Sequence, residues 1–125
     1  MMTAPTVAAT ATAAAPTARV ELLIDGAWVP VCDLSHLTPG RGVAVLLPDG
    51  SQAAVFRDRH DRVYAIANRD PFTGAQVLSR GLLGTVGDRP YVASPLLKQR
   101  FDLTGGECLD DERVRIPVHT ARVRP

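Results

Sequence analysis

Short β-favouring runs separated by turn residues constrain the fold of this chain more than any other feature. From Val20 onward, such runs recur about every eight to twelve residues, the spacing typical of sandwiches and barrels. No stretch shows the sustained 3.6-residue period of a long helix. The pattern predicts an all-β domain, built as a small antiparallel sandwich or barrel.

Two turn sequences predict where the hairpins of this domain lie. The expected strands are residues 42–47, 52–57, 63–67, 82–86, 90–93 and 113–118. Pro48-Asp49-Gly50-Ser51 and Gly87-Asp88 are turn sequences, so the strands on either side of each should form a hairpin. Residues 113–118 alternate apolar and polar or proline positions, as a strand with one exposed face does. Residues 68–81 and 94–99 are predicted to be loops, and residues 33–37 a short helix.

The beginning of the chain differs in composition from the rest. Residues 1–19 consist mostly of Ala, Thr, Pro and Val, with no Lys or Arg before Arg19. A secretory signal needs a basic start and a strongly apolar centre, so this segment is not predicted to be one. We expect a disordered tail over residues 1–19 and one domain over residues 20–125.

Charge and cysteine content exclude several classes of partner. A net charge of +1 provides no basic field for nucleic acid or an anionic membrane surface. No apolar run approaches the roughly 20 residues of a membrane-spanning helix. Cys32 and Cys108 lack the dense spacing of a disulfide scaffold and are expected to be small buried residues. These features favour a cytoplasmic protein.

The two predicted loops resemble the cluster-binding loops of Rieske iron–sulfur proteins. Asp70-Pro71-Phe72-x-Gly74-Ala75, followed by Leu78-Ser79-x-Gly81, is similar to Cys-Pro-His-x-Gly-Ala with a downstream Leu-Ser-x-Gly. The run from Ser94 to Phe101, followed by Gly105-Gly106-Glu107, is similar to Cys-Pro-x-His-Gly-x-x-Phe leading into a Gly-Glu turn. The resemblance implies a Rieske-like fold. It places Asp70 and Ser94 at the two cysteine positions, and Phe72 and Leu97 at the two histidine positions.

These four residues cannot replace the ligands of a Rieske cluster. The cluster needs two thiolates on one iron and two imidazoles on the other. Phe72 and Leu97 have no lone pair to donate, and Asp70 and Ser94 offer oxygen where sulfide-bound iron prefers thiolate. We therefore expect no cluster, other metal or cofactor in this chain. Phe72 and Leu97 are expected to fill the vacated space, contributing roughly 1.5–3 kcal/mol per buried side chain.

Loops with these replacements resemble the small subunits of assimilatory NAD(P)H-dependent nitrite reductase. The elements that carry this resemblance are Asn68-x-Asp70-Pro71-Phe72, residues 77–82, residues 93–101 and Cys108. In that family the large subunit carries FAD, an iron–sulfur cluster and sirohaem, and reduces nitrite to ammonium. The resemblance implies a non-redox subunit that supports or assembles with the large catalytic subunit in nitrate assimilation. It implies no catalytic residue in this chain.

The edge built by the two loops is the hypothetical partner-binding surface, because Rieske domains present this edge to their redox partners. We define the rim as the six residues Arg69, Pro71, Arg80, Pro95, Leu96 and Lys98. An apolar centre with a cationic border suits a protein interface. The alternative is that the loops only close one end of the domain and that docking uses another face.

Two other functional interpretations stay open at this point. The chain could be a Rieske-type ferredoxin that transfers electrons to another oxidoreductase, such as an oxygenase. It could also be a stand-alone interaction module. Among the aromatic residues, Trp28 and Phe101 are expected to anchor the core. The sequence does not distinguish NADH from NADPH, because the nucleotide would bind elsewhere.

Overall fold

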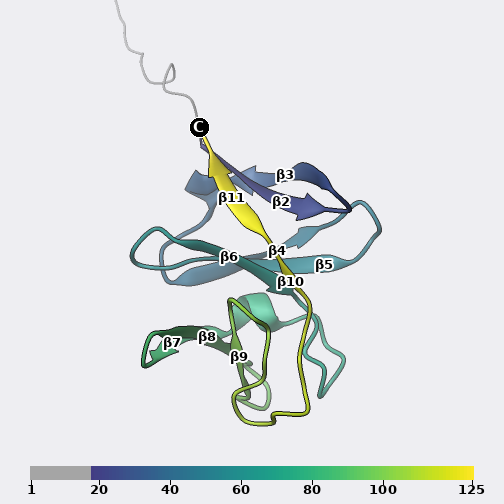
Figure 1. Ribbon diagram of the computed structural model, residues 1–125, viewed down its shortest axis with the longest axis vertical. Coiled ribbons are helices and arrows are strands. Elements are labelled where there is room, and N and C mark those ends of the chain that lie inside the picture. The colour runs from purple at the N-terminus through teal and green to yellow at the C-terminus, as the bar shows by residue number, and fades with distance from the viewer. Residues whose placement is uncertain (1–17) are drawn as a thin grey trace, which may run out of the picture.

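Three small antiparallel sheets lie one above another along the long axis of the computed structural model, which describes residues 18–125 (Figure 1). The strands are β2 (Arg19–Ile24), β3 (Ala27–Asp33), β4 (Arg41–Leu46), β5 (Gln52–Arg57), β6 (Val63–Ala67), β7 (Leu82–Val86), β8 (Arg89–Ala93), β9 (Arg100–Asp102), β10 (Val118–His119) and β11 (Ala121–Arg124). Residues 1–17 of the tail predicted over residues 1–19 lie outside the described residues. Its last residue, Arg19, instead opens β2, because it pairs with Asp33 and Arg124.

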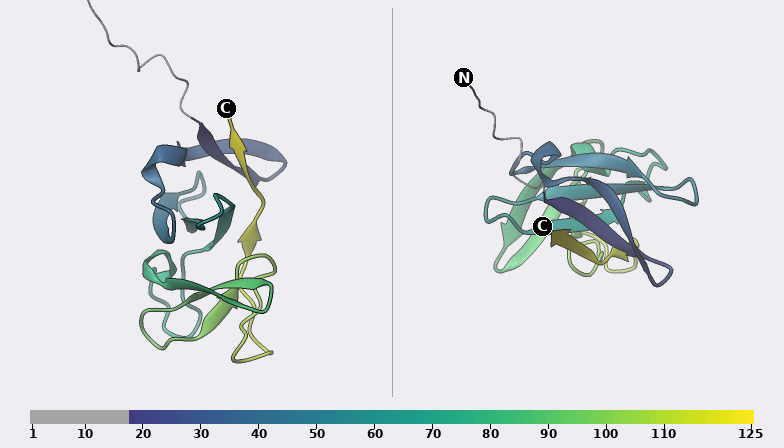
Figure 2. Two further views of the ribbon diagram at one scale, coloured as in Figure 1. Left: turned by 90° about the vertical axis from the view of Figure 1, so that its left-hand side faces the viewer. Right: turned by 90° about the horizontal axis from the view of Figure 1, so that it is seen from above.

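The middle sheet carries the core on both of its faces. Its strand order is β10-β6-β5-β4, and it lies between the sheets β11-β2-β3 and β7-β8-β9 (Figure 2). Alternate residues of β5 serve opposite faces: Ala54 and Phe56 join the core on the side of β7–β9, whereas Ala53 and Val55 join the core on the side of β2. The all-β prediction is confirmed.

Both predicted hairpins form where their turn sequences indicate. β4 pairs with β5 across residues 47–51, where Gly50 has a φ of 89° and the Ser51 N–H donates to Asp49 Oδ1. β7 pairs with β8 across Gly87, which has a φ of 61°. Each turn thus has a residue in the left-handed region that glycine adopts without strain.

The predicted strand over residues 113–118 is wrong except at its end. Only Val118 belongs to a strand, β10, and Arg115 forms an isolated bridge with Glu107. Pro117 has no N–H, and the Ile116 N–H donates to the Gly106 carbonyl in a loop, so no continuous ladder forms. The alternation itself is real, because Ile116 is buried and Val118 packs against the core.

The two aromatic residues expected in the core have different surroundings. Phe101 in β9 is fully buried. Trp28 is only half-buried, and the Arg122 guanidinium stacks on its ring with Cζ 4.0 Å from the centroid. The prediction for Trp28 is therefore wrong, since its ring serves a cation–π contact between β3 and β11 at the surface.

Within residues 18–125, helical structure is limited to two single 3₁₀ turns, η1 (Leu34–His36) and η2 (Leu78–Arg80). η1 lies within the predicted short helix at residues 33–37. In the part of the chain that the structure describes, no helix is long and apolar enough to cross a membrane.

A buried carboxylate ties β9 to β8 and to the turn that follows β9. Asp102 accepts hydrogen bonds from Arg89 Nε at 2.7 Å, from Thr104 N–H at 2.7 Å and from Gly105 N–H at 3.0 Å. Burial raises the pKa of Asp102, but the hydrogen bonds from Thr104, Arg89 and Gly105 outweigh burial and lower it to about 2. The charged form is thus favoured in the folded state.

The depressed pKa of Asp102 predicts a loss of stability in acid. The folded-state pKa lies below the usual value of an aspartate, about 3.9, so the stabilisation is complete above about pH 4 and is lost as the pH falls toward 2. We expect Asp102 to contribute about 2 kcal/mol over this window. Urea unfolding of the wild type and of Asp102→Asn, at pH 5 and at pH 2.5, measures this contribution. If the stability difference between the two proteins is the same at both pH values, the prediction is contradicted.

Candidate functional site

The two loops that resemble cluster loops lie at the same end of the domain. The first loop, residues 68–81, connects β6 to β7 and contains η2; the second loop, residues 94–99, connects β8 to β9. A bridge between Arg69 and Gln76 closes the tip of the first loop. The sequence therefore predicts both loops correctly as non-strand segments.

A hydrogen bond joins the two loops at the former cysteine positions. The Ser94 hydroxyl donates to Asp70 Oδ2 at 2.5 Å. Asp70 is 0% exposed and Ser94 is 2% exposed. Two cysteines at these positions would bind the same iron. In this chain, a direct bond between the side chains therefore replaces the connection that the metal would make.

Each of these two residues also shapes its own loop. Asp70 Oδ1 accepts the Phe72 N–H at 2.8 Å, and the Asp70 carbonyl accepts the Gly74 N–H at 2.7 Å. In the second loop, Ser94 Oγ accepts the Leu96 N–H at 3.3 Å. The pair Asp70–Ser94 thus acts both within the loops and between them.

The two former histidine positions have different environments. Phe72 is half-buried and packs against the core, with its ring centroid 6.3 Å from that of Phe101. Leu97 is 54% exposed. The prediction that Phe72 fills vacated space agrees with this packing, whereas the same prediction for Leu97 is wrong, because Leu97 lies at the tip of a loop where no core side chain covers it.

The residues at the four positions do not fit a Rieske cluster. The Asp70 carboxyl group is already engaged by Ser94 and by a backbone N–H. The Phe72 ring packs against the apolar core and Leu97 is exposed to solvent. Neither side chain has an atom that can bind iron. Among residues 18–125, no group of three or more His, Cys, Asp or Glu side chains is placed to hold a metal ion.

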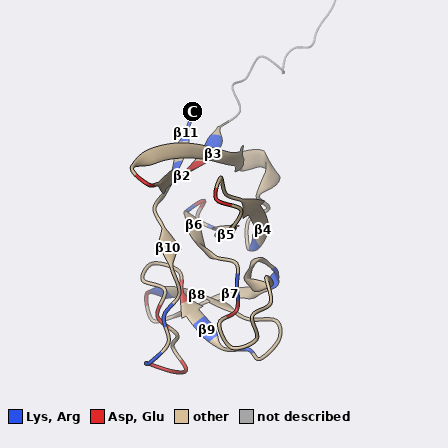
Figure 3. Ribbon diagram, turned by 90° about the vertical axis from the view of Figure 1, so that its right-hand side faces the viewer, with Lys and Arg blue, Asp and Glu red and all other residues tan. Residues whose placement is uncertain are grey.

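All six rim residues are exposed. Leu96 is 49% exposed, which is high for an apolar side chain of its size. Basic positions lie on the loops around β7, β8 and β9 (Figure 3). Within residues 18–125, Arg69, Arg80 and Lys98 form no ion pair, whereas Arg89 and Arg100 in the same end of the domain are paired with carboxylates.

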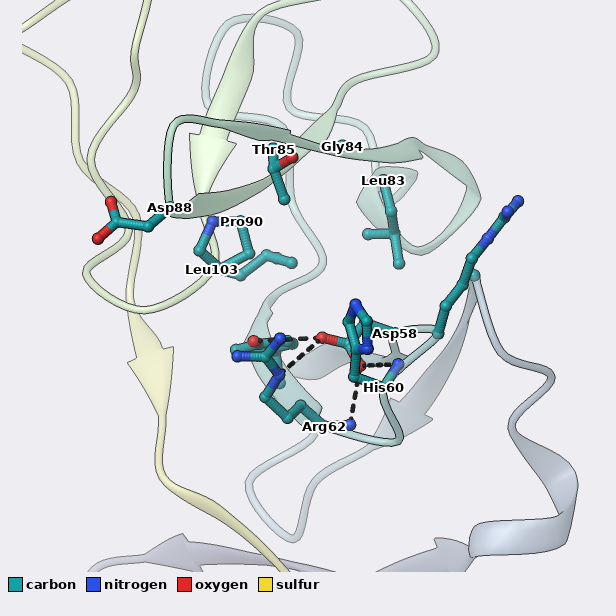
Figure 4. A pocket seen from close by; sticks show the side chains of 12 residues that line it. Asp58, His60, Arg62, Leu83, Gly84, Thr85, Asp88, Pro90 and Leu103 are labelled. Carbon is teal, nitrogen blue, oxygen red and sulfur yellow. Dashed lines mark hydrogen bonds and ion pairs between the residues drawn. The ribbon is translucent and has the colours of Figure 1, made fainter.

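A cavity of about 330 Å³ lies between the β5–β6 turn and the β7–β8 hairpin (Figure 4), and none of the residues that line it belongs to the rim. Sequence reasoning did not identify it. One of its lining residues, Asp58, accepts the backbone N–H groups of His60 and Arg62 at 2.8 and 2.9 Å, and its second carboxylate oxygen lies 3.2 Å from Arg62 Nε. Asp58 therefore stabilises the turn. The Tyr64 hydroxyl, which also lines the cavity, donates to Asp58 Oδ2 at 3.5 Å, and burial raises the pKa of Tyr64, which favours its protonated form.

Comparison with known proteins identifies the family. A model of the Rieske-like [2Fe-2S] domain matches residues 27–125. The nitrite reductase (NADH) small subunit of Salmonella typhimurium is 46% identical over 98 residues, which span 78% of this chain and 90% of that protein. The chain belongs to the family of nitrite reductase small subunits. A crystal structure from Mycobacterium tuberculosis, described as an NADH-dependent nitrite reductase small subunit, has 48% identity and a TM-score of 0.71 over 79% of this chain and 96% of that one.

Two further relatives bear on how such a small subunit works. The nitrite reductase [NAD(P)H] large subunit of Klebsiella oxytoca is 45% identical over 83 residues, which are 66% of this chain but only 8% of that protein. The ferredoxin of carbazole 1,9a-dioxygenase from Nocardioides aromaticivorans has 28% identity and a TM-score of 0.61 over 78% of this chain and 96% of that one. The small-subunit fold is thus shared with an oxygenase ferredoxin and with a segment of a large subunit.

Proposed function

We propose that this chain is a non-redox small subunit of an NAD(P)H-dependent nitrite reductase, and that it binds the large catalytic subunit through the rim. The hydrogen bond between Asp70 and Ser94 is the observation that carries the proposal. This bond supports the proposal, because it joins two cluster-type loops whose side chains do not fit the ligation of iron. A domain that keeps this edge without the cluster retains a surface for recognition but no route for electrons.

The relative in Klebsiella oxytoca supports the large subunit as the partner. There, a segment similar to this chain belongs to the same polypeptide as the large subunit. Covalent linkage makes the contact between two modules intramolecular, at an effective concentration that is often millimolar. Two separate chains need a surface that provides the same association by affinity, and the rim suits that purpose.

The composition of the rim indicates the chemistry of its counterpart. Pro71, Pro95 and Leu96 provide exposed apolar area, which favours burial against another protein. The cations Arg69 and Arg80 have no ion-pair partner within residues 18–125 and are free to pair across an interface. We therefore propose that the rim docks on an apolar face of the large subunit bordered by carboxylates.

The redox groups of the reaction belong to the large subunit in this proposal. FAD, an iron–sulfur cluster and sirohaem would perform the reduction of nitrite to ammonium there, and this chain would contribute binding and stability. Cys32 and Cys108 are both free thiols, which suits a reducing cytoplasm. The ferredoxin function has support from the fold alone, because the four ligand positions do not fit a cluster.

Charge reversal on the rim tests this proposal. We expect Arg69→Glu combined with Arg80→Glu to weaken binding to the holo large subunit by about tenfold or more, because the new carboxylates would face an acidic surface. Isothermal titration calorimetry measures the dissociation constant. Arg19→Glu with Arg124→Glu, in the sheet at the other end of the domain, makes the same change in net charge and should leave binding unchanged. Equal affinities for all three proteins would show that docking uses another face.

A further inference from the structure

Lys98 has a backbone conformation that lysine rarely adopts. Its φ is 66°, in the left-handed region, and it stands where the second Rieske loop motif has glycine. The other non-glycine residues with positive φ among residues 18–125 are Asp25 and Asp61. Aspartate tolerates this region comparatively well, whereas the Cβ of most other residues crowds the following carbonyl. A glycine at position 98 would relieve this strain.

The second loop imposes this conformation through its backbone. The Lys98 N–H donates to the Ser94 carbonyl at 3.0 Å, and the Ser94 N–H donates to the Gln99 carbonyl at 2.9 Å. Ser94 is in turn fixed by its bond to Asp70. None of these bonds uses the lysine side chain, so the loop would close equally well with glycine. The fold therefore does not explain why a lysine is present.

The side chain of Lys98 also has no structural partner. Lys98 is exposed, and within the described residues its ammonium group forms no ion pair. Its neighbours Leu96 and Leu97 are 49% and 54% exposed. Strain that the surroundings hold in place without structural benefit is typical of functional positions.

We infer that Lys98 serves binding, and that its ammonium group pairs with a carboxylate of the large subunit. The inference rests on the proposed function and adds a single determinant to it. Docking would cover Leu96 and Leu97 and remove water from around Lys98, which strengthens an ion pair by lowering the local dielectric constant. Lys98 thus lowers the stability of the free chain and raises its affinity for the large subunit. Residues of functional sites often lower stability in this way.

Lys98→Gly separates the two effects, because stability and binding should change in opposite directions. We expect the thermal midpoint to rise by about 2–4 °C as the strain is removed. We expect the affinity for the holo large subunit to fall about tenfold, with a weaker dependence on salt. Lys98→Ala keeps the strain but lacks the charge, so it should lose affinity without gaining stability. Lys98→Arg keeps the charge and should bind within about threefold of the wild type.

Asp25→Gly is the matched control, since Asp25 has a φ of 50° in the β2–β3 turn, far along the chain from the two loops. It should leave affinity unchanged. If the wild type binds and Lys98→Gly binds equally well, the role of Lys98 is refuted while the proposed function stands. If the wild type itself does not bind the large subunit, both are refuted. A lower thermal midpoint for Lys98→Gly would also refute the inference, because lysine would then serve the fold.

Discussion

Asp70→Ala is expected to destabilise the domain by about 2–4 kcal/mol. Asp70 is fully buried, and its carboxyl group accepts the Ser94 hydroxyl and the Phe72 N–H. Removing this group leaves the buried Ser94 hydroxyl and the partly buried Phe72 N–H without an acceptor, and a buried unpaired group costs about 1–3 kcal/mol. Urea unfolding of both proteins at pH 7 measures the difference.

A double-mutant cycle assigns this effect to the bond between the loops. Ser94→Ala removes the hydroxyl that donates to Asp70 and the acceptor of the long bond from the Leu96 N–H, at 3.3 Å. It should still cost less than Asp70→Ala, because the Phe72 N–H keeps its acceptor. Asp70→Ala with Ser94→Ala should cost less than the sum of the two single changes, since each removes a partner of the other. Additive effects would mean that the two loops are held together by other contacts.

Phe101→Ala is expected to have the largest effect of all single substitutions considered, about 3–5 kcal/mol. Phe101 is fully buried in β9, directly after the second loop, and its ring contacts that of Phe72 from the first loop. Its loss would open a cavity between the two loops as well as remove buried apolar surface. Unfolding in guanidinium chloride with detection by circular dichroism measures the change.

Leu97→Ala is the control for this substitution. This substitution also removes an apolar side chain from the same end of the domain, but more than half of the Leu97 side chain is exposed. Its replacement should change stability by less than about 0.5 kcal/mol. A cost comparable to that of Phe101→Ala would mean that Leu97 does fill the space of the missing cluster.

The turn sequences predicted the two hairpins, whereas the strand expected over residues 113–118 was wrong because it depended on long-range pairing. Pro48-Asp49-Gly50-Ser51 and Gly87-Asp88 specify their turns by themselves. The ladder expected over residues 113–118 depended on a partner strand that the fold does not supply, since Ile116 bonds to a loop. The β2–β3 hairpin was not identified individually, although Asp25-Gly26 is a strong turn signal.

The candidate site was predictable in part for similar reasons. Alignment of the two loop motifs located Asp70 and Ser94, and cysteines at these positions share an iron, so their proximity followed. That aspartate and serine form a donor and acceptor pair could also have been read from the residue types. The exposure of Leu97 could not be predicted from the sequence, because apolar character alone does not distinguish a core position from a loop tip. The strain at Lys98 required the backbone dihedral angle.

Side-chain contacts, with the Asp70–Ser94 hydrogen bond foremost, hold together in this chain the loops that iron holds in Rieske proteins. Iron and acid-labile sulfide, measured on the folded chain purified without oxygen and confirmed by visible absorption, test this claim most directly. We expect a colourless protein with only trace amounts of both and with a cooperative unfolding transition that chelators do not alter. A brown protein with stoichiometric iron and sulfide, as a [2Fe-2S] domain requires, would contradict it.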